Sequence, residues 1–165
     1  MLCQYGCPNL AKISEIKVPI TEITGNKLVS AVAASGDFLA LAMTSTDGVD
    51  MCIYLYKTKQ QIVYCDKKTY VQSNATRINP VVSMQLKRYA NMNLLLAACQ
   101  FERLNCYAIN KRELVLIANA YDSSSVFDGK IGLASSVCMQ GNYIMLLGKE
   151  KREVKVKLFK LKYIE

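Results

Sequence analysis

The sequence contains no histidine and no tryptophan among its 165 residues. The absence of histidine excludes the Ser-His-Asp and Cys-His arrangements of nucleophilic catalysis. It also excludes every metal site that needs an imidazole ligand. Because histidine is the most frequent general acid or base, we predict that the protein is not an enzyme and uses no cofactor.

Glycine and proline are scarce, with 8 and 3 copies, which excludes collagen-like and low-complexity chains. No run of about 18 apolar residues occurs, so we expect no membrane span, and the amino terminus lacks the pattern of a signal peptide. Hydrophobic residues make up 52% of the chain and charged residues 21%. This balance predicts a folded core rather than disorder, and the length fits a single domain over 1–165.

Seven cysteines leave at least one thiol unpaired in a monomer. Cys3 and Cys7 could be half of a zinc site or two thiols at the amino terminus; no second pair has zinc-finger spacing, so we expect no metal. Unpaired thiols predict a reducing compartment, intracellular and either cytoplasmic or nuclear. Four cysteines lie inside apolar runs, where we interpret them as small hydrophobic residues: Cys52, Cys99, Cys106 and Cys138.

Apolar residues recur with a period of two, in short runs separated by Gly, Asp, Asn and Ser, which is typical of antiparallel β-structure. Two sets of about four predicted strands are followed by a third set of three. The predicted strands are 28–34, 38–43, 51–56 and 61–65; 80–86, 93–99, 103–109 and 113–118; and 131–138, 143–147 and 153–161.

The second strands of these sets can be aligned, with Phe38, Leu94 and Tyr143 as equivalent positions. The steps are 56 residues, from position 38 to 94, and 49 residues, from 94 to 143. A repeat of about 50 residues with about four strands is typical of a propeller blade. We therefore divide the chain into an amino-terminal segment with a candidate closing strand, 1–26, and blade-like repeats at 27–66, 78–120 and 129–163.

The segments 35–42, 54–59 and 107–111, with a weaker copy at 159–161, resemble a diverged WD-repeat β-propeller, although the Trp-Asp and Gly-His pairs are absent. The resemblance implies an all-β fold of antiparallel four-stranded blade-like repeats in a partial or split β-propeller. A β-sandwich or barrel is the alternative. Propellers usually have about 4–8 blades, so three repeats would need a protein partner or a second copy to complete the propeller.

Lysine and arginine total 21 against 13 acidic residues, a net charge of +8, which favours nucleic acid or acidic protein as a partner. Most basic residues form pairs beside predicted turns, on the same side of successive blades if the repeat register is right. We predict that the partner-binding residues are Lys87, Arg88, Tyr89, Lys111, Arg112, Lys151 and Arg152. Candidate phosphate contacts are Lys67, Lys68, Lys155 and Lys157.

The last predicted strand alternates, with Val154, Val156 and Leu158 on one face and Lys155 and Lys157 on the other. The pattern changes phase at Phe159, which is compatible with a β-bulge. Its lysines suit either a protected sheet edge or a contact with phosphates or an acidic partner.

Ten tyrosines are the chain's main aromatic residues. Tyr54, Tyr107 and Tyr143 lie within strand patterns, and we expect them in the core. Tyr89 follows Lys87 and Arg88, so it is suited to a protein interface or to stacking on a base.

These observations favour a non-catalytic protein–protein interaction scaffold, a propeller-like module within a larger assembly. The alternative function is that of a basic RNA- or ribosome-associated binding protein. The salt dependence of binding separates the two, because contacts with phosphates weaken steeply as salt rises.

Overall fold

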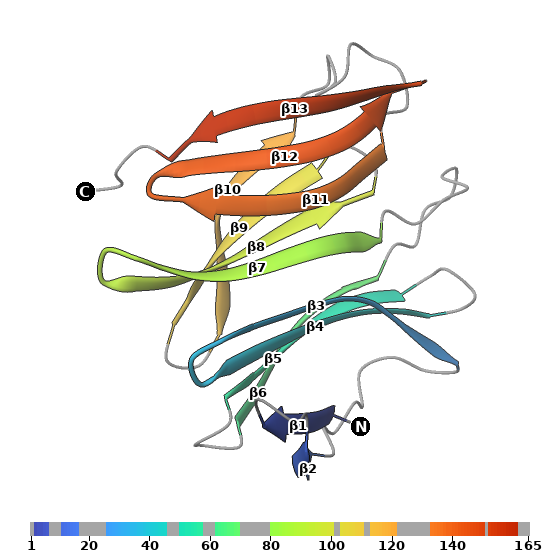
Figure 1. Ribbon diagram of the computed structural model, residues 1–165, viewed down its shortest axis with the longest axis vertical. Coiled ribbons are helices and arrows are strands. Elements are labelled where there is room, and N and C mark those ends of the chain that lie inside the picture. Colours follow the sequence, from blue (N-terminus) through green and yellow to red (C-terminus); the bar gives the residue numbers. More distant parts are fainter. Residues whose placement is uncertain are drawn as a thin grey trace.

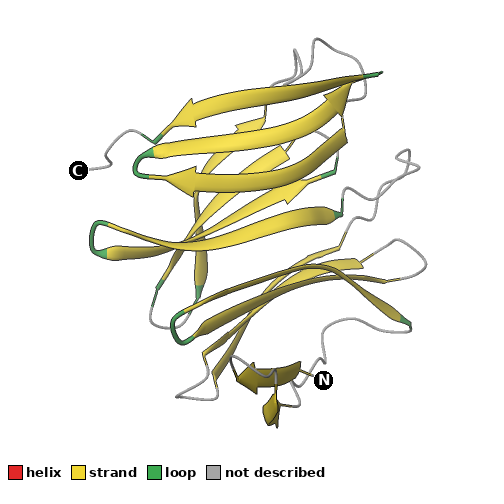
Figure 2. Ribbon diagram, viewed as in Figure 1, coloured by secondary structure: helices red, strands yellow, loops and turns green. Residues whose placement is uncertain are grey.

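Every regular element in the described part of the computed structural model is a β-strand (Figure 2). The described residues are 2–6, 11–16, 26–45, 50–57, 62–69, 80–100, 103–110, 113–121, 133–150 and 152–161. Over these ranges the chain forms no helix that could cross a membrane. The predicted all-β fold class is confirmed.

The strands form three larger antiparallel sheets and one small one, each a meander of sequential strands (Figure 1). The first sheet contains β3 (Lys27–Ser35), β4 (Phe38–Ser45), β5 (Asp50–Lys57) and β6 (Ile62–Thr69). The second contains β7 (Val81–Tyr89), β8 (Met92–Cys99), β9 (Arg103–Ile109) and β10 (Leu114–Tyr121). The third contains β11 (Leu133–Gln140), β12 (Tyr143–Glu150) and β13 (Glu153–Lys160). The small sheet pairs β1 (Leu2–Gly6) with β2 (Ala11–Ile16).

The first hairpin of each large sheet has the same two-residue turn. Primed hairpin turns, whose twist matches that of the strands, need a positive φ at their first central residue. That residue is Gly36, Ala90 or Gly141, with φ of 56°, 51° and 58°. The three sheets therefore begin with equivalent hairpins, although the second has alanine where the others have glycine.

These turns fix the structural alignment of the repeats. β4, β8 and β12 begin at Phe38, Met92 and Tyr143, so the steps are 54 residues from 38 to 92 and 51 from 92 to 143. The predicted match of the first and third repeats is correct, but the middle repeat was placed two residues too late. Its apolar run begins at Leu94, two positions after the turn. Because side chains alternate with period two, this error leaves each side chain on its predicted face.

A serine bulge also repeats between the first and third sheets. The register of β3 shifts around Ser30, and that of β11 shifts around Ser135. The Ser30 hydroxyl donates to the carbonyl of Ala42, and the Ser135 hydroxyl donates to that of Leu147, each at 3.3 Å. Ala42 and Leu147 are equivalent in the structural alignment, so the two sheets share this detail as well.

The three large sheets stack face to face, with their first strands nearest one another (Figure 1). The backbone N–H of Val137 donates to the Ser83 hydroxyl at 3.1 Å, and that of Met139 donates to the Gln85 side-chain oxygen. These bonds join β11 to β7 directly. No described sheet closes on itself as in a barrel, and three stacked sheets exceed a two-sheet sandwich.

Two apolar cores fill the spaces between the sheets. Small side chains of the first sheet, such as Ala40 and Ala42, allow the second sheet to approach closely. The core between the first and second sheets contains Ala31, Ala33, Ala40, Ala42, Ile53, Leu55, Val81, Met84, Leu86, Leu95, Ala97, Cys99 and Tyr107. The core between the second and third contains Leu94, Leu96, Ala98, Leu104, Cys106, Ala134, Val137, Met139, Ile144 and Leu146.

Candidate functional site

The face of the third sheet that points away from the second carries large exposed apolar side chains. Val154 is 72% exposed, Leu158 65% and Val156 55%. We call this surface the outer face; its large apolar residues are Tyr143, Met145, Leu147, Val154, Val156 and Leu158. A contiguous apolar surface of this kind marks an interaction site more often than isolated exposed residues do.

The strand register makes the outer face continuous. Met145 pairs with Leu158, and Leu147 pairs with Val156, so apolar side chains lie side by side across β12 and β13. The next pairs in each direction contain a lysine, because Lys149 pairs with Val154 and Tyr143 pairs with Lys160. The Lys160 ammonium lies 5.8 Å from the centre of the Tyr143 ring. Met145, Leu147, Val156 and Leu158 therefore form an apolar band, and an exposed lysine lies at each of its two ends.

The same positions of the second sheet are buried beneath the third. The turn alignment makes Met145 and Leu147 equivalent to Leu94 and Leu96, which are 1% and 0% exposed. The pairing of Leu96 with Cys106 corresponds to that of Leu147 with Val156, and Cys106 is buried as well. The outer face thus occupies the place of a face that another sheet covers, and no described strand covers it.

The opposite end of the stack differs from the outer face. On the side of the first sheet that points away from the second, most of the large side chains of β4 and β5 are at most 5% exposed: Leu41, Met43, Cys52, Tyr54 and Tyr56. Figure 1 shows the β1–β2 sheet on this side. Val29 and Val32 of the first strand stay exposed there, at 56% and 53%, and Ala34 is exposed on the same face.

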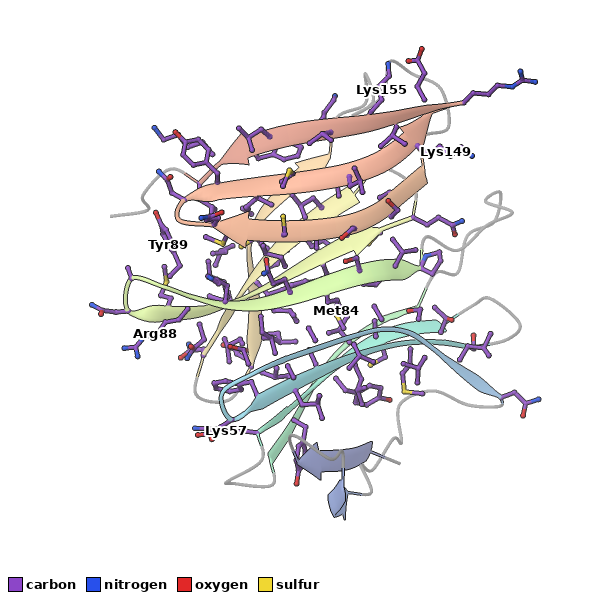
Figure 3. The ribbon with its side chains drawn as sticks, viewed as in Figure 1. Lys57, Met84, Arg88, Tyr89, Lys149 and Lys155 are labelled. Atoms are coloured by element: carbon purple, nitrogen blue, oxygen red, sulfur yellow. The ribbon has the colours of Figure 1, made fainter. Side chains whose placement is uncertain are left out.

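The predicted basic residues do not all lie on one side. Lys87 and Arg88 are exposed and Tyr89 is half-buried where β7 meets its hairpin (Figure 3). Arg152 lies in the turn between β12 and β13, at the opposite end of the strands from the β7–β8 hairpin. Successive hairpins of a meander alternate between the two ends of a sheet, and this turn is the second of its sheet. The expectation of a single side is therefore wrong for Arg152.

Two other predicted pairs involve residues outside the described part. Lys111, Arg112 and Lys151 lie outside the described residues. The flanking Asn110 and Glu113 are described, and the Asn110 N–H donates to the Glu113 carbonyl at 3.0 Å. Asn110 and Glu113 follow β9 and precede β10, so they lie at the same end of the strands as Lys87 and Arg88.

The candidate phosphate contacts lie away from the outer face. Lys155 and Lys157 of β13 are half-buried on the face toward the second sheet, and the Lys155 ammonium is 4.0 Å from a Glu153 carboxylate oxygen. Lys67 and Lys68 lie in β6, and their side chains fall outside those described. The predicted alternation of β13 is confirmed, since its valines and lysines face opposite sides.

The phase change at Phe159 does not produce a bulge. β12 and β13 pair without a register shift from Tyr143–Lys160 to Glu150–Glu153. Phe159 instead continues the face of the lysines and packs against the core between the second and third sheets.

A small apolar pocket of about 120 Å³ lies between the outer strands of the second and third sheets. Burial raises the pKa of the Cys106 thiol from 9.0 to about 11, so this thiol is protonated and unreactive near neutral pH. The lining residues are Leu104, Cys106, Ala118, Ile144, Phe159, Lys160 and Leu161. The pocket offers packing but no nucleophile.

The cysteines divide into two kinds. Cys99, Cys106 and Cys138 are reduced thiols, as the apolar runs predicted. Cys52 is disulfide-bonded, so its interpretation as a free apolar thiol was wrong. Within the described ranges, His, Cys, Asp and Glu form no group of three or more suited to a metal ion.

The core position was predicted correctly for two tyrosines and wrongly for a third. Tyr54 and Tyr107 are each 1% exposed, whereas Tyr143 is 46% exposed. Strand patterning predicted an apolar face for β12 but did not show that it would lack a covering sheet. The outer face was therefore missed as a site. No known protein family matches the sequence, and no curated protein matches it.

Proposed function

We propose that the protein is a non-catalytic interaction module, a propeller-like unit that joins a larger protein assembly through the outer face of its third sheet. One observation carries the proposal: six large apolar side chains are 36–72% exposed on that face. Four of their equivalents in the second sheet, Leu94, Leu96, Leu104 and Cys106, lie in the core between the second and third sheets. Burial of such a surface is the main driving force for protein association.

The basic residues give less support to the alternative RNA-binding function. Exposed Lys87 and Arg88 lie at one end of the strands, and exposed Lys149 and Arg152 lie toward the opposite end of the strands. Recognition of a nucleic-acid backbone requires a basic patch or stripe along one face. A divided distribution favours a protein partner over a polyphosphate chain.

Sedimentation of the tagged full chain in extracts of its source cells tests the proposal. We expect a species well above the 18.4 kDa of the chain alone, unchanged by ribonuclease. The double substitution Met145→Lys and Val156→Lys should return the chain to the position of the monomer. Lys87→Glu with Arg88→Glu is the control, because these residues are exposed but distant from the outer face, and it should leave the assembly intact.

Two results would contradict the proposed function. The first is a large species that ribonuclease dissolves and that the Lys87 and Arg88 substitutions abolish, which would support RNA binding. The second is sedimentation as a monomer without any substitution. Circular dichroism of the purified variants verifies that each one is folded.

A further inference from the structure

The interface between the second and third sheets shows which side chains a sheet packed on the outer face must have. At that interface, Leu94 and Leu96 of β8 and Leu104 of β9 contact the inner side chains of the third sheet, including Ile144 and Leu146. The outer face presents apolar side chains at the same positions of β12 and β13. An arriving sheet therefore needs an apolar face of similar size.

The first strands add a polar contact to this interface. Ser83 and Gln85 of β7 accept the backbone N–H groups of Val137 and Met139 from β11. Gln85 pairs with Leu96, and Ser136 pairs with Leu147, so Ser136 occupies the position of Gln85 in the third sheet. Ser136 is exposed, and its hydroxyl can accept a backbone N–H from a strand that lies beside β11.

The charges of the outer face select against a second copy of this chain. Among its described side chains, Lys149 and Lys160 are the charged groups, and none is a carboxylate. Two copies that met through their outer faces would bring only lysines together at the ends of the band. Like charges brought together in an interface oppose association.

A ring of two copies joined end to end meets a different obstacle. It would place the outer face of one copy on the far side of the first sheet of the other. The β4 and β5 side chains on that side, such as Leu41 and Tyr54, are already buried within one chain. Over β4 and β5, the surface that such a ring requires is therefore covered.

We infer that the occupant of the outer face is a blade-like antiparallel sheet of a different protein. Its first strand lies beside β11 and donates a backbone N–H to Ser136, and its next strands cover Met145, Leu147 and Val156. Acidic side chains at the ends of its apolar face lie opposite Lys149 and Lys160. This inference rests on the proposed function and specifies the partner's chemistry.

The test uses the full chain with the photo-reactive amino acid p-benzoylphenylalanine at Val156 or at Ser136, irradiated in its source cells. We expect both positions to form adducts with one other protein. The partner residue that reacts with position 156 should lie in a strand of alternating apolar residues. An aspartate or glutamate should lie within about four residues of it in the partner's sequence. Val32 is the matched control, because it is 53% exposed at the opposite end of the stack, and it should not react with that protein.

Charge reversal supplies the second part of the test, with the purified partner identified by the adduct. Lys149→Glu with Lys160→Glu should weaken binding about tenfold or more, as expected for like charges placed opposite each other. Lys87→Glu with Arg88→Glu makes the same change in net charge elsewhere and should alter affinity less than about twofold.

Each contrary result has a separate meaning. Adducts between two copies of this chain would overturn the inference and leave the proposed function standing. The same holds if the partner segment is helical or lacks acidic residues, or if charge reversal has no effect. Failure of Val156 and Ser136 to form any protein adduct would overturn both the inference and the proposed function.

Discussion

Ala90 adopts a backbone conformation that glycine adopts at the equivalent turn positions of the other two large sheets. Its φ is 51°, in the left-handed region, whereas the equivalent turn residues are Gly36 and Gly141. An L-residue pays about 1–2 kcal/mol in that conformation. A β-carbon added at Gly36 or Gly141 would meet nothing within 4 Å, so the cost of alanine there comes from the backbone alone.

We predict that Ala90→Gly raises the free energy of unfolding by about 0.5–1 kcal/mol, because release of strain exceeds the added chain entropy of glycine. Gly141→Ala should lower it by about the same amount and serves as the reciprocal control. Urea denaturation measures both. A destabilising Ala90→Gly would show that the turn is not strained.

Burial also separates the reduced thiols by reactivity. Cys138 is partly exposed, whereas Cys106 is buried and its pKa is raised to about 11. We predict that iodoacetamide at pH 8 modifies Cys138 well before Cys99 or Cys106, as followed by peptide mass spectrometry. Equal rates for Cys106 and Cys138 would contradict the burial of Cys106.

The raised pKa of Cys106 also predicts how stability depends on pH. The folded state holds this proton up to about pH 11, whereas the unfolded thiol releases it near its usual pKa of 9.0. The folded chain therefore binds more protons between these values, and stability falls as pH rises through that range. Urea denaturation at pH 8 and pH 10 measures this effect. Between these two pH values, the free energy of unfolding should fall less in Cys106→Ala than in the parent chain.

At the scale of the strand, β12 shows directly how the two faces of the third sheet differ. Leu146 is fully buried against the second sheet, whereas Leu147 is 36% exposed on the outer face. We predict that Leu146→Ala lowers the free energy of unfolding by about 2–5 kcal/mol, and that Leu147→Ala lowers it by less than about 1 kcal/mol. Equal losses would mean that the outer face is covered in the isolated chain.

Strand positions could be predicted because period-two patterning and turn residues are local properties. The runs 38–43 and 143–147, for example, lie within β4 and β12. The register of the middle repeat could not be predicted in the same way, because its apolar run begins two residues after the turn, and only the paired strands reveal this offset. The open face of β12 was also hidden, since an apolar alternation is the same whether or not another sheet covers it.

At the scale of the whole molecule, the structure consists of stacked sheets with two unlike ends. The first sheet is covered over β4 and β5, and the third sheet is open. In the proposed propeller-like assembly, each blade-like sheet has a neighbour on both faces. We therefore propose another protein as the next neighbour of the third sheet.

We predict that the isolated chain is a monomer of about 18.4 kDa by light scattering, at both low and high salt. Lysines on the outer face oppose self-association most strongly at low salt, where charges are least screened. A stable dimer of about twice that mass at both salt concentrations would instead support two copies that complete one another.

The exposure of two methionines provides the most direct test of the central claim. Met145 on the outer face is 41% exposed, and Met92 beside the β7–β8 hairpin is 39% exposed, so hydroxyl radicals should oxidise both in the isolated chain. In the assembly purified from source cells, we predict that oxidation of Met145 falls about fivefold or more, as for a residue in an interface core, while Met92 is unchanged. Equal oxidation of Met145 in the isolated and assembled chain would contradict the account.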